Sequence, residues 1–284
     1  MSAASVLALS YAVLSLVLAV LAHRKPRTPV NEPPDWGVCE DTVIAARDGE
    51  RNGGLLETWR VWPEGEPRGV AVFCHGFTRN RDKMTSRARP FGKTGFITVM
   101  ASARDHGKSS RLWLPSVRTF AEDIASLIAW AGPPVILYGH SLGAAGAVMA
   151  ASENPDAVRL LILEGCFLRV RTAQLRLYRA FNPFFGWIFG PGVLFWTEVL
   201  QRFRQPLMDP VRNAGKIRCP VLILHGERDD KFPASYAPKL GRAFAPGQAR
   251  VFIVPDGDHT SAGETETAKN AVAAFVEEML GKSE

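Results

Sequence analysis

The amino-acid sequence predicts an α/β fold, with a mostly parallel central sheet that helices cover on both faces. Short β-branched runs alternate with longer segments of helical periodicity, which is typical of a parallel sheet with helical crossovers. Apolar runs such as Val70–Cys74 have no polar position, as expected for strands buried on both faces. The 284 residues are 46% hydrophobic and 22% charged. This composition indicates a globular protein and excludes a disordered chain and a polytopic membrane protein.

The expected elements follow one another in a regular order after residue 38. The sheet should open with an antiparallel pair, Val43–Ala46 and Glu57–Trp62, joined by the turn-rich segment Asp48–Gly54. Ser116 can cap a helix that runs to Ala131, because apolar residues recur there on one face. The other expected strands are Val70–Cys74, Phe96–Ala101, Val135–Tyr138, Leu160–Leu163, Val221–Leu224 and Val251–Val254. The other expected helices are Leu142–Ser152, Ala234–Phe244 and Glu264–Leu280.

The N-terminal segment Ala3–Ala22 is 20 residues long and carries no charge. As a helix it would span about 30 Å, the hydrocarbon thickness of a bilayer. A cleaved signal peptide and a buried core helix are the alternatives. Basic residues lie in the following cluster, His23–Arg27, and are missing from Met1–Ser5, which favours a retained anchor with the remaining chain on the cytoplasmic face. We expect an anchor at 1–22 and a Pro-rich linker at 23–37.

The net charge of +6 does not indicate a nucleic-acid binder. The positive excess lies in two segments, the cluster after the apolar N-terminus and residues 167–204, and no zinc-finger, helix-turn-helix or RNP signature accompanies it. The four cysteines form no CxxC pair and no metal-ligand spacing, so we expect free thiols. We expect neither a metal nor an organic cofactor.

One motif indicates nucleophilic catalysis. Gly139–Gly143 fits the pattern G-x-S-x-G and falls between a predicted buried strand and a predicted helix, where the pattern marks a nucleophile elbow. Ser141 would sit on a strained turn, and side chains at Gly139 or Gly143 would collide with neighbouring backbone. Ser141 is therefore the candidate nucleophile.

A serine nucleophile needs a base and a group that orients the base. Of the six histidines, His259 alone follows the last predicted strand, at the edge where open α/β sheets place their sites. The loop after the preceding strand, His225–Pro233, supplies three candidate acids, of which Asp229 is preferred: Glu227, Asp229 and Asp230. The order Ser141, Asp229, His259 matches the chain order of a known serine triad.

With these residues the chain resembles the α/β-hydrolase-fold serine hydrolases over roughly residues 38–282. The resemblance rests on five motifs: His75-Gly76-Phe77, Asp105-His106-Gly107-Lys108-Ser109, Gly139–Gly143, His225–Pro233 and Gly257-Asp258-His259. It implies that Asp229 is the acid, with Glu164 as an alternative position. It also implies that the backbone N–H groups of Phe77 and Leu142 form the oxyanion hole.

In this family the segment 167–213 is the position of a cap within the domain 38–284. Ten of the 37 residues from Phe167 to Phe203 are aromatic. They either pack the cap onto the sheet or rest, with the nearby arginines, on an anionic membrane that supplies acyl substrates. The expected activity is hydrolysis of a carboxylic ester or thioester, with a serine peptidase, an acyltransferase or a non-catalytic binding protein as alternatives. Oligomeric state stays open.

Overall fold

The computed structural model describes residues 2–24, 27–30, 32–48 and 51–281. Within these residues, eight strands form one sheet in the order β1-β2-β4-β3-β5-β6-β7-β8. β1 pairs antiparallel with β2, and β2 pairs antiparallel with β4. All other neighbours are parallel. The predicted mostly parallel α/β sheet is confirmed.

Every predicted strand is present, and most extend one or two residues beyond the predicted bounds. The strands are β1 (Val38–Asp48), β2 (Arg51–Trp62), β3 (Gly69–Cys74), β4 (Phe96–Ala101), β5 (Val135–His140), β6 (Val158–Glu164), β7 (Val221–Gly226) and β8 (Ala249–Val254). The helices are α1 (Ala3–His23), α2 (Thr85–Lys93), α3 (Val117–Ala131), α4 (Leu142–Glu153), α5 (Val170–Phe181), α6 (Pro183–Ile188), α7 (Gly190–Leu200), α8 (Pro210–Asn213), α9 (Tyr236–Gly241) and α10 (Glu266–Gly281).

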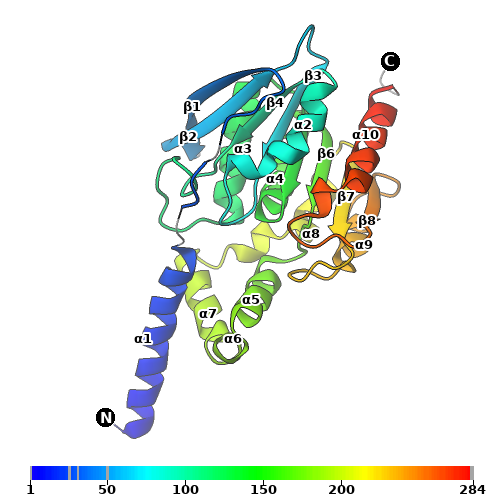
Figure 1. The fold of residues 1–284 in the computed structure, drawn as a ribbon. Helices are drawn as coiled ribbons and strands as arrows, with labels where there is room; N and C mark the ends of the chain where they lie inside the picture. The colour runs from blue at the N-terminus through cyan, green and yellow to red at the C-terminus, as the bar shows by residue number, and fades with distance from the viewer. Residues whose placement is uncertain (1, 25–26, 31, 49–50, 282–284) are drawn as a thin grey trace.

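Helices cover both faces of the sheet (Figure 1). Alternate residues of each central strand point to opposite faces, so Val72 joins one core cluster and Phe73 the other. The first cluster buries α3, α4 and α9, and the second buries α2 and α10. Apolar runs such as Val70–Cys74 therefore have no polar face because both faces are covered.

Two local predictions were wrong in detail, and one helix was missed. The segment Arg51–Gly54 belongs to β2 rather than to a turn, because it continues the ladder with β1; the register shift beside Ala46 is a β-bulge at Gly53. Residues 49–50 lie outside the described residues. α9 is shorter than the predicted helix Ala234–Phe244. Helix α2 was not anticipated, since Arg87 occupies its buried face and hides the apolar pattern.

The described residues of the Pro-rich segment after α1 contact the loops after β3 and β4 and strand β4 itself. An Arg27 guanidinium N–H donates to the carbonyl oxygens of Gly107 (3.2 Å) and Ser109 (2.8 Å). The Asn80 amide donates to the carbonyl of Pro29 at 2.7 Å, and the buried Trp36 donates to Thr98 Oγ1 at 3.1 Å. The described part of this segment is therefore fixed to the domain rather than free; Lys25 and Pro26 lie outside the described residues.

The segment predicted as a cap, 167–213, places α5, α6 and α7 beyond the carboxyl ends of the strands and then continues through a 3-10 turn at Gln205–Met208 into the short α8 (Figure 1). α1 lies beside α7 and extends away from the sheet. Among the described residues, α1 is the one helix long and apolar enough to cross a membrane.

Candidate active site

The three residues predicted as a triad lie on loops at the carboxyl ends of parallel strands. Ser141 follows β5, Asp229 follows β7 and His259 follows β8. β5 is separated from β7 by β6 in the sheet, and β8 is next to β7. Their loops therefore meet at one edge, as the topology of an open α/β sheet requires.

Ser141 occupies a strained backbone conformation at the start of α4. Its φ of 54° and ψ of −116° are unfavourable for a residue with a Cβ. A Cβ at Gly139 would lie 2.6 Å from Ala144 Cα, and one at Gly143 would meet the carbonyl oxygens of Cys74 and His75. The close approach that the two glycines were expected to permit is confirmed.

Ser141, His259 and Asp229 form a continuous chain of hydrogen bonds. His259 Nε2 lies 3.0 Å from Ser141 Oγ, and His259 Nδ1 lies 2.8 Å from Asp229 Oδ2. Since a carboxylate can only accept, Nδ1 carries the ring proton and Nε2 is left as an acceptor for the serine hydroxyl. The arrangement can move the hydroxyl proton to the imidazole while Asp229 stabilises the resulting cation.

Asp229 is held in its ionised form although it is buried. Burial by itself would raise its pKa, but hydrogen bonds from His225 and His259 outweigh that effect and place the pKa well below the usual aspartate value. The backbone N–H groups of Lys231 (2.9 Å) and Phe232 (2.7 Å) also donate to Oδ1. The carboxylate is thus oriented by four donors, and its charge is available to His259 at neutral pH.

Phe77 and Leu142, the predicted oxyanion-hole residues, flank the serine. Leu142 is the first residue of α4, and the first N–H groups of a helix have no acceptor within it. The turn that carries Phe77 lies against the serine, because a Cβ at Gly76 would be 3.0 Å from Ser141 Cβ. The structure therefore brings both backbone segments to the nucleophile.

Two buried histidines connect the Phe77 turn to the loop after β4. His75 Nδ1 donates to the Gly76 carbonyl (2.7 Å), and its Nε2 accepts from the Ala103 N–H (2.9 Å). His106 Nδ1 donates to the Arg104 carbonyl (3.0 Å), and its Nε2 accepts from the Thr78 N–H (3.2 Å). Each ring needs one donor and one acceptor nitrogen and so must be neutral. Consistently, burial lowers the pKa of both, that of His75 to about 3.

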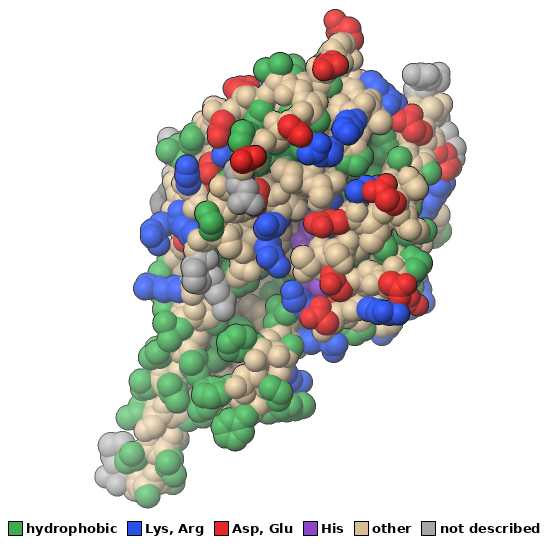
Figure 2. Space-filling view, in the orientation of Figure 1, with side chains coloured by type: hydrophobic (Ala, Val, Ile, Leu, Met, Phe, Trp, Pro, Cys, Tyr) green, Lys and Arg blue, Asp and Glu red, His purple; other side chains and the backbone are tan. Residues whose placement is uncertain are grey.

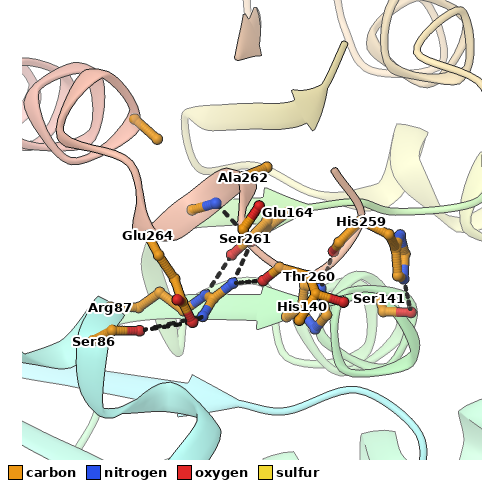
Figure 3. A network of polar contacts seen from close by, with 12 residues as sticks. Ser86, Arg87, His140, Ser141, Glu164, His259, Thr260, Ser261, Ala262 and Glu264 are labelled. Carbon is orange, nitrogen blue, oxygen red and sulfur yellow. Dashed lines mark hydrogen bonds and ion pairs between the residues drawn. The ribbon is translucent and has the colours of Figure 1, made fainter. Parts of the chain in front are cut away.

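Glu164, the alternative acid position, has different partners (Figure 3). Its carboxylate accepts two N–H bonds from Arg87 (2.7 and 2.8 Å), the Tyr138 hydroxyl (2.7 Å) and the Gly263 N–H (2.9 Å). Burial would raise the pKa of Glu164, but the Arg87 cation and these donors lower it to about 2. Asp229, not Glu164, is the carboxylate that His259 contacts.

The same ion pair holds the loop that carries His259. Arg87 Nη2 donates to the Thr260 carbonyl at 2.6 Å, and Arg87 Nη1 donates to Glu264 Oε1 at 2.5 Å. His140 Nε2 donates to the His259 carbonyl at 2.8 Å (Figure 3). The loop is therefore tied at three points around His259.

Sequence analysis did not anticipate the supporting roles of Arg87, His75 and His106. Both histidines lie in motifs already quoted for the family resemblance. Each is followed by a glycine in the loop after a strand, and this pattern was the one signal that could have indicated a supporting role. Arg87 gave none, because α2 itself was missed. Cys74, Cys166 and Cys219 are buried free thiols and Cys39 is a half-buried one. In the part of the chain that the structure describes, no group of three His, Cys, Asp or Glu side chains could hold a metal ion.

Known proteins resemble this chain in sequence and in structure. Residues 65–194 match the family described as serine aminopeptidase, S33. The chain is 30% identical over 254 residues to a monoacylglycerol lipase of Mycolicibacterium smegmatis, covering 75% of this chain and 89% of the relative. It is 27% identical over 240 residues to the lysophosphatidylserine lipase ABHD12 of Macaca fascicularis, covering 76% of this chain and 56% of the relative.

Two solved structures show the same fold. An esterase of Pyrococcus furiosus superposes with a TM-score of 0.71 at 17% identity, covering 90% of this chain and 96% of that chain. A bacterial membrane phospholipase A superposes with a TM-score of 0.65 at 19% identity, covering 98% and 94% of the two chains.

We predict that Arg87→Met destabilises the protein and slows any reaction at Ser141. The substitution leaves Glu164 buried without its cation, which costs about 3–5 kcal/mol, and frees the His259 loop, so that activity falls by about 100-fold. Arg89→Met, on the same helix, removes an exposed pair with Asp35 and should cost less than about 1 kcal/mol. Urea unfolding and initial rates compare the two variants; equal effects would contradict the prediction.

We predict that His140 makes the fold less stable as the pH falls from 6.5 to 5. Burial lowers the pKa of His140 to about 4, so below pH 6.5 the unfolded chain binds a proton that the folded chain does not. Asn at position 140 keeps a donor and removes the titration. Relative to the wild type, His140→Asn should gain about 1–2 kcal/mol across this pH range. Urea unfolding at both pH values measures the gain, and a constant difference between the two proteins would refute it.

Proposed function

Because the chain belongs to the α/β-hydrolase family of esterases and lipases, we propose that it cleaves a carboxylic ester or thioester of an acyl or lipid-like substrate. Ser141 is the nucleophile, His259 the base and Asp229 the residue that orients the base. The observation that carries this proposal is the unbroken hydrogen-bond chain from Ser141 Oγ through His259 to Asp229.

The reaction proceeds through an acyl-enzyme. Ser141 Oγ attacks the carbonyl carbon as its proton passes to His259 Nε2, and Asp229 stabilises the imidazolium. The N–H groups of Phe77 and Leu142 bind the oxyanion, at about 2.7–4 kcal/mol for each donor in comparable sites. His259 then protonates the leaving alcohol or thiol. Water, deprotonated by the same ring, releases the acid.

The names of the relatives, which are lipases, support ester cleavage over peptide cleavage as the reaction of this chain. A serine peptidase is the second candidate. The observation in its favour is the match of residues 65–194 to a family described by aminopeptidase activity. An acyltransferase would use the same three residues with an alcohol in place of water.

We also propose that α1 anchors the enzyme in a membrane, with residues 38–284 as the catalytic domain on the cytoplasmic side. Most of α1 is exposed, since 11% of its most apolar 18-residue window is buried. A helix of this length and composition fits the hydrocarbon layer of a bilayer, and the low burial argues against a core helix. The basic residues after Ala22, among them Arg24 and Arg27, favour the cytoplasmic orientation.

Activity on glycerol monoesters of increasing chain length tests the reaction. Wild-type protein in detergent should hydrolyse them, with kcat/KM rising from acetyl to medium or long chains, while peptide amides and a Ser141→Ala variant should show no turnover above background. Faster cleavage of an aminopeptidase substrate than of any ester would replace the proposal with its alternative.

Reporter fusions test the topology. In a bacterial host, green fluorescent protein at the C-terminus should fluoresce in the membrane fraction, while alkaline phosphatase at the same position should be inactive, because the cytoplasm is reducing. Intact mass should show a chain that retains residues 1–22. A mature chain that begins at His23, or an active phosphatase, would contradict the anchor or its orientation.

A further inference from the structure

Two uncharged stretches that are far apart in the sequence lie side by side. One is residues 3–22 in α1, and the other is residues 180–197, which cover α6 and most of α7. α1 and α7 pack against each other, while the outer surface of both stretches is apolar (Figures 1 and 2).

The contact between α1 and the cap is close and polar at its centre. Tyr11 Oη donates to the Ile188 carbonyl at 2.8 Å, and Trp196 Nε1 donates to the Ala12 carbonyl at 2.9 Å. Ser15 is fully buried against Gly192, where an added Cβ would lie 2.8 Å from Ser15 Cβ. Small residues and hydrogen bonds between helices are the means by which helices associate inside membranes.

The cap tip exposes large apolar side chains instead of burying them. Phe181 is 88% exposed, Phe184 68% and Trp187 64%. Figure 2 shows hydrophobic side chains over the lower part of the molecule, where α1 packs against α7 of the cap. The two surfaces are contiguous, so the medium that covers α1 must also cover the cap tip.

The length of α1 fixes how deep this tip lies. Tyr11 is about 18 Å from His23 along the helix axis, and the hydrocarbon of one leaflet is about 15 Å thick. If His23, at the C-terminal end of α1, lies at the membrane–water interface, then Ile188 lies near the centre of the bilayer, because its carbonyl is hydrogen-bonded to Tyr11. The tip is therefore deeper than an interfacial helix, which is buried about 5–10 Å.

The positions of the arginines are consistent with this depth of the cap tip. Arg24, Arg27, Arg202 and Arg204 follow the two uncharged stretches, and the Arg176 guanidinium donates to the Lys231 carbonyl of the domain. Arg24, Arg202 and Arg204 are exposed, so phosphate groups at the domain side of the two stretches would meet them, whereas Arg27 and Arg176 are held by carbonyls of the domain. Arg179, which precedes residue 180, stacks its guanidinium 3.7 Å from the Trp187 ring, so this cation lies on an aromatic face at the cap tip.

We propose that α1 crosses the bilayer and that the cap helices α6 and α7 insert beside it into the acyl-chain layer of one phospholipid leaflet. The cap is then immersed rather than resting on the surface, and an acyl substrate reaches Ser141 from within the leaflet. α1 then packs against the cap as well as anchoring the chain in the membrane. The inference rests on the proposed function for the anchor and for the lipid-like substrate, and the position of the cap is measured without catalysis.

Depth-dependent quenching tests the insertion in the full chain carrying Ser141→Ala. Phe184→Cys, labelled with an NBD fluorophore, is reconstituted in phosphatidylethanolamine–phosphatidylglycerol vesicles containing nitroxide lipids; Val251→Cys on the exposed strand β8 is the control, and the parent without an added cysteine gives the background. The label at position 184 should be quenched at least twice as strongly by a nitroxide at acyl carbon 12 as by one on the headgroup. The label at position 251 should be quenched by neither.

Stronger quenching of position 184 by the headgroup nitroxide would mean that the cap rests on the surface, and would overturn the inference. Quenching only by aqueous iodide would mean that water covers the tip. Protection from all quenchers would mean that a protein surface, such as a second copy of the chain, covers it. Either result would overturn the inference. Because the protein carries Ser141→Ala, none of these outcomes depends on the triad.

A matched pair of glycine variants tests the coupling of α1 to the cap. Gly192→Ala forces α1 and α7 apart at Ser15, whereas a Cβ at Gly190 meets Leu175 at an ordinary 3.6 Å. Gly192→Ala should lower the rate on a long-chain monoacylglycerol in vesicles at least 3-fold relative to the rate on soluble p-nitrophenyl acetate. Gly190→Ala should leave that ratio unchanged. The same ratio in both variants, or an equal loss on both substrates, would contradict the coupling.

Discussion

The site depends on Glu164, the residue at the end of β6, which is bonded to both the nucleophile turn and the histidine loop. Its carbonyl accepts the backbone N–H of Ser141 at 2.8 Å. Its carboxylate is neutralised by Arg87 and accepts the Gly263 N–H, just beyond His259. A buried carboxylate without these partners would be costly, so the pair fixes where the two loops can lie. The residue that could have been the triad's acid instead supports its geometry.

The sequence allowed the parts of the site that depend on local chemistry to be predicted. The glycines around Ser141 had to be present wherever a strand turns sharply into a helix, and the order of strands put Asp229 and His259 at the same edge. Arg87 could not be predicted, because a charge on the buried face of α2 is stable only through Glu164, 77 residues away. Likewise, the motifs around His75 and His106 did not reveal that each ring joins two loops.

The two positively charged segments of the chain border the apolar surface that α1 and the cap helices share. The arginines border two uncharged stretches, and the hydrogen bonds of Tyr11 and Trp196 join these stretches although they are about 180 residues apart. A cap held this way has its position set by α1, while Ser141 is held by the rigid sheet. In the proposed membrane-bound state, movement of the bilayer relative to the domain would therefore act on the cap and not on Ser141, Asp229 and His259.

Labelling with a fluorophosphonate probe tests the triad most directly. The wild type should take up one probe, on Ser141, and Ser141→Ala none. Asp229→Asn should slow labelling by about 10⁴-fold, because the wrong tautomer of His259 is then favoured. Asp230→Asn, which changes the exposed neighbouring carboxylate, should label at the wild-type rate. Labelling that survives Ser141→Ala, or equal rates for the two aspartate variants, would contradict the assignment.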